Sequence, residues 1–188
     1  MNLIKLEQVV ATPWKNGGGI TRELYCYPVA AKFDDFVWRV SVAELSQASV
    51  FSIFPGVDRV ITVLEGEGLD MNTLTLRPFQ PYRFCGEQII HAQPQGGVCQ
   101  DFNLMLRRGT VSGEVQVWHG DHEIGENCVV LFCAQGKWEI SPRVGASVLF
   151  DAKQTWIRNT MRGKLSLCAL QADSIVLSVM IHEANQHE

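Results

Sequence analysis

The stretch that decides the fold is Val60-Ile61-Thr62-Val63-Leu64-Glu65-Gly66, an apolar strand pattern that ends at a glycine. Seventy positions later the chain repeats this pattern as Val130-Leu131-Phe132-Cys133-Ala134-Gln135-Gly136. Each segment is typical of a strand that leads into a hairpin. The similarity either arises by chance, because such hairpins are common, or marks two copies of one barrel in a single chain. Two barrels would be joined near Arg107-Arg108-Gly109-Thr110.

Short apolar or alternating runs continue on both sides of these segments, separated by Gly, Pro, Asn and Asp. In the first half we predict strands over 21–27, 36–43, 50–54, 59–65, 82–85, 89–93 and 100–106. In the second half we predict them over 114–118, 128–134, 138–140, 147–150, 155–157, 165–171 and 175–182. Helical turns are expected only near 6–10 and 43–48. Many short strands at close spacing predict an all-β sandwich or barrel.

Composition excludes several classes of partner. The formal net charge of −4 argues against nucleic acid, which requires a basic face. No apolar run approaches the roughly 20 residues of a membrane span, so no membrane partner is expected. The N-terminus has no apolar signal core, and the six cysteines form no Cys-x-x-Cys pair. These features predict a cytoplasmic protein with free cysteines.

A glycine-rich loop, Thr12-Pro13-Trp14-Lys15-Asn16-Gly17-Gly18-Gly19, precedes the first long strand. Glycine tolerates positive φ and allows close approach of backbone or ligand. The composition of the loop is typical of a plain surface turn. It is equally suited to present Lys15, Asn16 and bare N–H groups to a small molecule.

Three predicted strands carry polar residues that alternate with apolar ones. Arg39 and Ser41 share a face of the first strand, Arg59 begins the second, and Asp101 and Asn103 alternate with apolar residues in the third. A solvated outer face explains this pattern, because arginine is mostly exposed. The alternative is a barrel interior that contains a polar patch.

In the interior interpretation, these side chains form a site for a small anion. Positive charge comes from Lys15, Arg39 and Arg59, amides come from Asn16 and Asn103, and Asp101 and Glu23 orient the arginines. The planar fork of arginine suits a carboxylate held by two hydrogen bonds. A small carboxylate is therefore the ligand class that these residues favour.

Nothing in the sequence points directly to catalysis, and no catalytic residue is assigned. His119-Gly120-Asp121-His122 offers two metal ligands, but metal sites normally need three or four. No nucleophile elbow, Ser/His/Asp order or phosphate loop is present. A binding protein is favoured over an enzyme, although a non-metal isomerase or hydrolase that uses Glu23, Glu65 or Asp101 as acid or base stays open. A protein-interaction module anchored by exposed aromatics is a third option, and its candidate anchors are Trp118, Trp138 and Trp156.

Several motifs between residues 10 and 106 occur together in a fixed order. They are Pro13-Trp14-Lys15-Asn16-Gly17-Gly18-Gly19, Trp38-Arg39-Val40-Ser41-Val42-Ala43, Phe51-Ser52-Ile53-Phe54-Pro55-Gly56, Arg59-Val60-Ile61-Thr62-Val63-Leu64-Glu65-Gly66-Glu67-Gly68, Leu76-Arg77-Pro78-Phe79 and Asp101-Phe102-Asn103-Leu104-Met105. Together they resemble the HutD/Ves family. Beyond residue 110 the resemblance rests mainly on the strand pattern.

The resemblance implies a bicupin, with two cupin-like β-barrels in one chain. The expected N-terminal barrel, residues 1–108, carries the motifs and the ligand site. The smaller C-terminal barrel, residues 109–188, is either complete in itself or completed by strands from the N-terminal half. Members of the family are linked to histidine utilisation, where they are thought to sense or limit pathway intermediates, and one relative is described as stress-induced. The suggested ligands are formylated or related acidic products of histidine breakdown.

The resemblance also implies which residues bind the ligand. They are Lys15, Asn16, Arg39, Ser41, Arg59, Asp101 and Asn103, with Trp14 and Glu23 in supporting positions. Metal-dependent cupins carry a His-x-His pair with a nearby Glu and a later His, whereas the corresponding segment here, residues 59–65, has no histidine. We therefore expect a metal-free binding protein without a cofactor, which senses or buffers an acidic metabolite. Whether it forms a homodimer is left open by the sequence.

Overall fold

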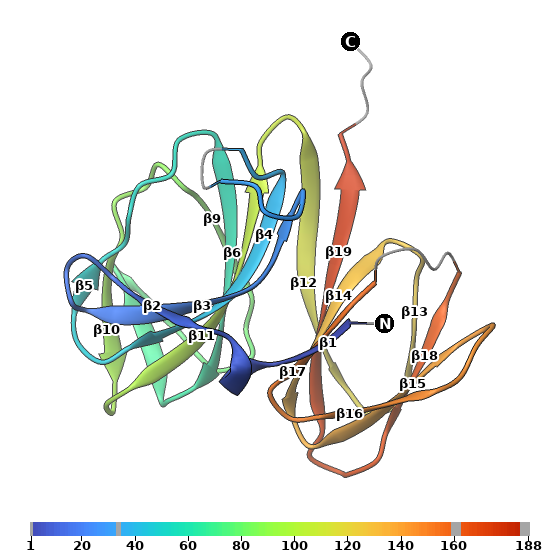
Figure 1. Cartoon of the computed structure of the whole chain (residues 1–188). Helices are drawn as coiled ribbons and strands as arrows, with labels where there is room; N and C mark the ends of the chain where they lie inside the picture. The colour runs from blue at the N-terminus through green and yellow to red at the C-terminus, as the bar shows by residue number, and fades with distance from the viewer. Residues whose placement is uncertain (1, 33–34, 159–162, 185–188) are drawn as a thin grey trace. The chain divides into compact units, whose positions relative to one another are not determined.

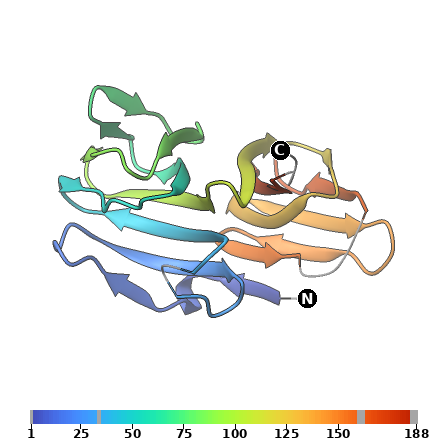
Figure 2. The same cartoon turned by 90° about the horizontal axis from the view of Figure 1, so that it is seen from above.

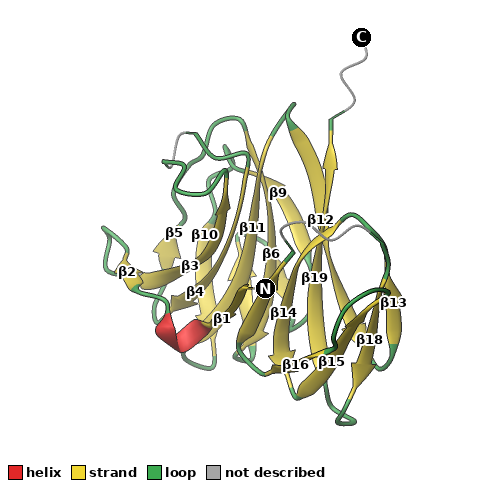
Figure 3. Ribbon diagram, turned by 45° about the vertical axis from the view of Figure 1, so that its right-hand side comes forward, coloured by secondary structure: helices red, strands yellow, loops and turns green. Residues whose placement is uncertain are grey.

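The computed structural model describes residues 2–32, 35–158 and 163–184, which form strands and a single 3-10 turn (Figures 1 and 3). The turn, η1, spans Leu6–Gln8, and no helix among the described residues is long enough to cross a membrane. The all-β prediction is confirmed. By its contacts the chain divides into two compact units, Val9–Ser112 and Gly113–His182, and the second unit also includes β1 and η1.

The unit Val9–Ser112 contains two sheets, of six and four strands. The six-stranded sheet has the order β2-β3-β4-β11-β6-β9, and the four-stranded sheet has the order β5-β10-β7-β8. The strands are β2 Ala11–Pro13, β3 Gly19–Tyr27, β4 Trp38–Leu45, β5 Ser49–Val50, β6 Val57–Glu65, β7 Gly68–Met71, β8 Leu74–Leu76, β9 Tyr82–Cys85, β10 His91–Gln95 and β11 Cys99–Arg107. All neighbouring strands of these two sheets run antiparallel.

The second unit also contains two sheets, with the orders β1-β17-β14-β19-β12 and β13-β18-β15-β16. Its strands are β1 Asn2–Lys5, β12 Val111–His119, β13 His122–Ile124, β14 Cys128–Gln135, β15 Lys137–Pro142, β16 Val148–Asp151, β17 Gln154–Ile157, β18 Leu165–Ala169 and β19 Ile175–Glu183. β1 pairs with β17 from Asn2 opposite Ile157 to Lys5 opposite Gln154. The first strand of the chain thus extends a sheet that is otherwise built from its C-terminal half.

The strand order of the first unit is repeated in the second. The run β4-β11-β6-β9 matches β12-β19-β14-β17, and β5-β10-β7-β8 matches β13-β18-β15-β16, with each strand replaced by the one eight places later. β6 and β14, which hold the two similar segments, are equivalent strands in this scheme. Each is followed by a glycine with positive φ, Gly66 at 106° and Gly136 at 72°. The bicupin prediction is confirmed by this repeat.

One element prediction is wrong, and several short strands escape the pattern. The segment 43–48 begins as strand rather than helical turn, because β4 continues to Leu45, which pairs with Cys99 on β11. This long-range pairing overrides local helical preference. Of the predicted strand 50–54 only Val50 is in β5, and the strands β7 and β8 were not predicted. Both belong to a tight hairpin, in which too few residues alternate to give a pattern.

Each unit has its own apolar core, built from residues of both of its sheets. Figure 2 shows the backbone of the sheets from above. In the first unit, Ile61 and Val63 of the six-stranded sheet pack in one cluster with Leu69 and Met71 of the four-stranded sheet. In the second unit, the corresponding cluster joins both of its sheets and contains Cys128, Leu131, Cys133, Trp138, Ile140, Phe150, Trp156, Leu165, Leu167 and Val176. The interior face of each large sheet is therefore identified by the residues that enter these clusters.

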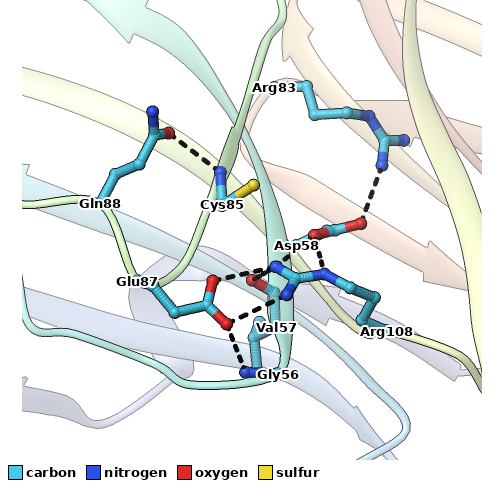
Figure 4. A network of polar contacts seen from close by, with 8 residues as sticks. All are labelled: Gly56, Val57, Asp58, Arg83, Cys85, Glu87, Gln88 and Arg108. Carbon is cyan, nitrogen blue, oxygen red and sulfur yellow. Dashed lines mark hydrogen bonds and ion pairs between the residues drawn. The ribbon is translucent and has the colours of Figure 1, made fainter.

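An exposed ion-pair network fixes the end of β11 to the start of β6 and to the loop after β9 (Figure 4). Arg108 donates through Nη1 and Nη2 to the two carboxylate oxygens of Glu87, at 3.0 and 2.9 Å, and through Nε to Asp58 at 2.8 Å. Glu87 also accepts from the backbone N–H of Gly56 at 2.8 Å. A bidentate arginine is the geometry in which a surface ion pair has a measurable effect.

We predict that Arg108→Gln destabilises the protein more at pH 7 than at pH 3. The hydrogen bonds from Arg108 lower the pKa of Glu87 to about 2. A carboxylate with a depressed pKa stabilises the fold above its unfolded-state pKa, and this contribution is lost as the pH falls toward the folded value. Urea unfolding of both proteins at the two pH values measures the difference, and Arg108→Lys is the control that keeps the charge without the fork. An equal destabilisation at both pH values would contradict the assignment.

Candidate functional site

Five polar side chains lie on one face of the six-stranded sheet, and we call them the inner polar cluster: Arg39, Ser41, Arg59, Asp101 and Asn103. On β11, Asn103 lies opposite Ser41 of β4 and Ile61 of β6. Two residues further, Met105 lies opposite both Arg39 and Arg59. Because residues directly opposite each other point to the same face, the cluster shares its face with Ile61.

This face is the interior of the first barrel. Ile61 and Val63, which lie on the same face of β6 as Arg59, belong to the core cluster that joins the two sheets. Only 7% of Arg59 and 1% of Asp101 are exposed. The outer-face interpretation of the polar strand pattern is therefore wrong for these residues, and the interior interpretation is correct.

Arg59 lies among three phenylalanine rings. Its guanidinium carbon is 5.1 Å from the ring centre of Phe51, 5.4 Å from that of Phe54 and 4.8 Å from that of Phe84. Its Nε donates to Asn103 Oδ1 at 3.4 Å, the one acceptor it has among the described residues. Burial lowers the pKa of Arg59 to about 10, so the group stays charged at neutral pH. A buried cation with a single neutral acceptor is an incompletely satisfied group.

Asn103 connects Arg59 to Asp101. Its amide nitrogen donates to Asp101 Oδ1 at 3.4 Å, while its amide oxygen accepts from Arg59. The other oxygen of Asp101, Oδ2, is buried and has no hydrogen-bond partner among the described residues. The cross-strand neighbours explain this, because Asp101 lies between Ala43 and Val63, which carry no donor in their side chains. Burial raises the pKa of the Asp101 carboxyl to about 7, although Asn103 and the charge of Arg59 act to lower it.

Arg39 lies at the more exposed side of the cluster. Its Nε donates to Glu23 Oε2 on β3 at 2.6 Å, and 11% of its side chain is exposed against 49% of that of Glu23. Its Nη1 is 3.5 Å from Ser41 Oγ and 3.6 Å from Met105 Sδ. Glu23 therefore orients Arg39, as predicted from the sequence, and offsets its charge.

The glycine-rich loop is held against β5 by Asn16. The Asn16 amide donates to Ser49 Oγ at 2.7 Å and to the Val50 carbonyl at 3.4 Å, and it accepts from the Gly18 N–H at 3.1 Å. A Cβ on Gly18 would lie 2.4 Å from Ser49 Oγ, so glycine is required for this close approach. Asn16 thus has a structural task in the loop, whether or not it contacts a ligand.

Trp14 connects this loop to the barrel interior, whereas Lys15 is exposed. The Trp14 indole nitrogen donates to Thr21 Oγ1 at 2.7 Å, and its ring meets the edge of Phe51 with the centres 6.0 Å apart. Phe51 also lies against Arg59. The contacts described here do not join Lys15 to the inner polar cluster, so its predicted role in ligand binding stays a prediction.

The sequence interpretation missed the three phenylalanines around Arg59. Phe51 and Phe54 were quoted as part of one family motif, and Phe84 lies in a predicted strand, but none was assigned to the site. Their signal is weak because an aromatic residue in a strand is far more often ordinary core. Only the pairing of Arg59 with Phe84 across β6 and β9 brings that ring to the guanidinium.

The second barrel has uncharged residues at the positions equivalent to Arg59, Asp101 and Asn103. The partners of Leu131 and Cys133 on β19 are Ser178 and Val176, which correspond to Asn103 and Asp101. Cys128, opposite Met180, takes the place of Arg59 opposite Met105. The buried charges of Arg59 and Asp101 therefore have no counterpart at these positions of the second barrel.

Two of the three proposed interaction anchors are not on the surface. Trp138 is fully buried, Trp156 is 2% exposed, and both belong to the core of the second barrel. Trp118 is half-buried, stacks on His122 and donates to Ser178 Oγ at 2.8 Å. The expectation of exposed aromatic anchors is therefore wrong for Trp138 and Trp156, because their indole rings fill the barrel.

No group of three or more His, Cys, Asp and Glu side chains that could hold a metal ion occurs within residues 2–32, 35–158 and 163–184. The inner polar cluster itself offers one carboxylate and one amide beside two guanidinium groups. Positive charge of this kind favours an anion over a metal cation.

Comparisons with known proteins agree with the motifs. The family model HutD matches residues 6–177. Protein Ves from Escherichia fergusonii is 34% identical over 176 residues, which cover 88% of this chain and 91% of that protein. These matches extend well beyond residue 110, where the sequence motifs become diffuse.

Solved structures show the same fold. A conserved protein of unknown function from Pseudomonas aeruginosa PAO1 has a TM-score of 0.86 at 26% identity, covering 96% of this chain and 97% of that one. HutD from Pseudomonas fluorescens SBW25 has a TM-score of 0.80 at 24% identity, covering 98% and 99%. A cupin 2 conserved barrel domain protein from Leptotrichia buccalis has a TM-score of 0.59 at 6% identity and covers 96% of each chain. The chain belongs to the HutD family and has its two-barrel cupin fold.

Proposed function

We propose that this protein binds a small carboxylate at the inner polar cluster and acts in the cytoplasm as a metal-free sensor or buffer of an acidic metabolite. The observation that carries the proposal is the Arg59 guanidinium, which is buried among three phenylalanine rings and has only the Asn103 amide as an acceptor in the described structure. A buried charge normally has an oppositely charged partner. A ligand carboxylate would supply it.

The chemistry of the cluster favours a carboxylate over other anions of similar charge. An arginine fork presents parallel N–H donors that match the two oxygens of a carboxylate. The aromatic rings around Arg59 exclude water, which strengthens such a pair. Arg39 and Ser41 add donors on the same face, while Glu23 offsets the charge of Arg39. One buried cation that makes no direct hydrogen bond to a carboxylate suits a single carboxylate group.

Family context narrows the ligand class further. We propose an N-formylated or related acidic product of histidine breakdown, as the resemblance to the HutD family implies. HutD from Pseudomonas fluorescens SBW25 is described in a formate condition. Formate and N-formylglutamate are therefore the first compounds to test. Lys15 and Asn16 are proposed as further contacts for a ligand longer than formate, since they lie in the loop that Trp14 joins to the barrel.

A second candidate function is a non-metal enzyme that acts on a formyl or imino derivative of an amino acid. It is supported by Asp101, whose pKa of about 7 suits a general acid or base at neutral pH. Among the described residues the Asp101 side chain is hydrogen-bonded to the Asn103 amide and to no nucleophile, and for this reason we favour binding. An NMR time course of a bound compound distinguishes the two, because only the enzyme produces new signals in proportion to its concentration.

A thermal-shift titration tests carboxylate binding. Formate and N-formylglutamate are expected to raise the melting temperature with dose, because a ligand that binds only the folded state stabilises it by mass action. At a hundredfold excess over Kd the gain is about 2.7 kcal/mol, which corresponds to roughly 5–10 °C for a chain of this size. Formamide, the neutral isostere of formate, is the matched control and should have no effect. A flat response to every acid tested would overturn the proposal.

A further inference from the structure

The buried oxygen Oδ2 of Asp101 is the unexplained atom of the inner polar cluster. Asp101 Oδ1 accepts from Asn103, whereas Oδ2 is shielded from solvent and has no partner among the described residues. Leaving a buried polar atom unpaired costs free energy, so such atoms point to a ligand or a proton. The atom lies on the same sheet face as Arg59, one hydrogen-bonded side chain away from it.

We propose that Asp101 is a ligand-binding residue that works in its protonated form: on binding, Oδ2 takes a proton from solvent and donates it in a hydrogen bond to the carboxylate held by Arg59. The protein therefore takes up one proton together with each carboxylate ion. No covalent bond other than the new O–H bond forms, and the complex gains no net charge. The proposal rests on the function proposed above and specifies how the site accepts an anion beside a carboxylate.

Charge balance supports this role. Arg59 can compensate one negative charge, and an ionised Asp101 would already use it. A second carboxylate beside it would leave two anions against one buried cation, and two such groups cannot both stay ionised in a dry site. Protonation of Asp101 releases Arg59 for the ligand and turns Oδ2 from a repelling acceptor into a donor.

The other titratable groups around Asp101 do not provide this proton. Arg59 on β6 acts on Asp101 as a cation, Arg39 on β4 acts in turn on Arg59, and Glu23 on β3 is held by Arg39. On its own strand, burial and the neighbouring Asp101 raise the pKa of Cys99 to about 12, so the thiol keeps its proton in the relevant range. Ala43 and Val63, which lie directly opposite Asp101, have no titratable group.

The free protein is poised for this exchange. Because burial places the pKa of Asp101 at about 7, the carboxyl changes state around neutral pH even without a ligand. A bound anion raises the pKa further. Between the pKa of Asp101 in the free protein and its higher pKa in the complex, each unit by which the pH rises weakens carboxylate binding about tenfold. Well below pH 7 the affinity does not change with pH.

Calorimetric titration of the full chain with sodium formate tests the proposal. At pH 7.5, the enthalpy measured in HEPES and in Tris buffers differs by the number of protons taken up times the difference in buffer ionisation enthalpy. We expect about 0.5 to 1 proton per formate, because at pH 7.5 most of the Asp101 carboxyl of the free protein, with its pKa of about 7, is ionised and must be protonated on binding. The Kd should rise about tenfold per pH unit above 7. Asp101→Asn keeps a donor but cannot titrate, so it should bind with no proton uptake and no dependence on pH. Asp173→Asn, an exposed aspartate of the second barrel, is the matched control and should behave as the natural protein.

The outcomes separate this proposal from the proposed function. Formate binding with no proton uptake and a constant Kd from pH 6 to 9 would overturn the role of Asp101 and leave carboxylate binding standing. Absence of binding at every pH would overturn both. The proton count of the natural protein decides the matter even if Asp101→Asn does not fold.

Discussion

Arg59→Met is expected to weaken carboxylate binding by at least a hundredfold, which is about 3 kcal/mol by the standard conversion. The substitution removes the buried charge and both free arms of the guanidinium fork, which in this account hold the ligand. Methionine keeps a straight apolar chain between the rings of Phe51, Phe54 and Phe84. It is a better choice than alanine, which would leave a cavity among these rings.

Two further variants sharpen this prediction. Arg59→Lys keeps the charge but loses the bidentate geometry, and it should bind with an intermediate affinity. Arg108→Gln removes an arginine of the exposed network and should leave the affinity unchanged. Calorimetry with formate and N-formylglutamate measures all four proteins, and circular dichroism confirms that each is folded. A folded Arg59→Met protein with unchanged affinity would contradict the assignment of the site.

Asp101→Asn is expected to become more stable than the natural protein as the pH rises from 4 to 7. The pKa of Asp101 is raised from 3.8 in the unfolded chain to about 7 in the fold. Between these values the folded protein holds a proton that the unfolded chain has released, so the free energy of unfolding of the natural protein falls as the pH rises. This pKa shift lowers the free energy of unfolding of the natural protein by at most about 4 kcal/mol. The loss is complete near pH 7 and stays constant at higher pH.

Urea unfolding of both proteins at pH 4.5, 6, 7.5 and 9 measures this effect as the difference between their free energies of unfolding. The difference should grow by about 2–4 kcal/mol toward pH 7 and then level off. Asp173→Asn serves as the control for the same change at an exposed position. A difference that does not change with pH would show that Asp101 is not held as a raised-pKa carboxyl inside the barrel.

Strand identity could be predicted from the sequence to a large extent, because the long strands carry their own pattern. The similarity of the segments that begin at Val60 and Val130 left chance and two barrels as alternatives, and the structure shows that β6 and β14 are equivalent strands. Short strands such as β8, with three residues, contain too little alternation to be recognised. The β4 residues after Ala43 were misjudged because long-range pairing holds them in the sheet, with β3 about 25 positions earlier and with β11 more than fifty positions later.

The polar side chains that meet inside the first barrel could be named from the sequence, but their environment could not. Both faces of β11 are buried, since Phe102 and Leu104 on one face and Asp101 and Asn103 on the other are all at most 5% exposed. Alternation alone cannot say which face of such a strand is interior. Oδ2 of Asp101 lacks a partner because the residues opposite it, Ala43 and Val63, have no side-chain donor. Only the pairing of three strands brings these residues together.

Nitrogen-15 NMR of the side chains, titrated with formate, tests most directly whether the inner polar cluster of the first barrel is the binding site. The Arg59 Nε–H signal, assigned through Arg59→Lys, and the indole signal of Trp14 report on the first barrel, because both side chains touch Phe51. The indole signals of Trp138 and Trp156 report on the core of the second barrel. The account predicts saturable shifts of Arg59 and Trp14 with Trp138 and Trp156 unmoved. Saturation confined to the indoles of the second barrel, or no shift of Arg59 at concentrations that stabilise the protein, would contradict it.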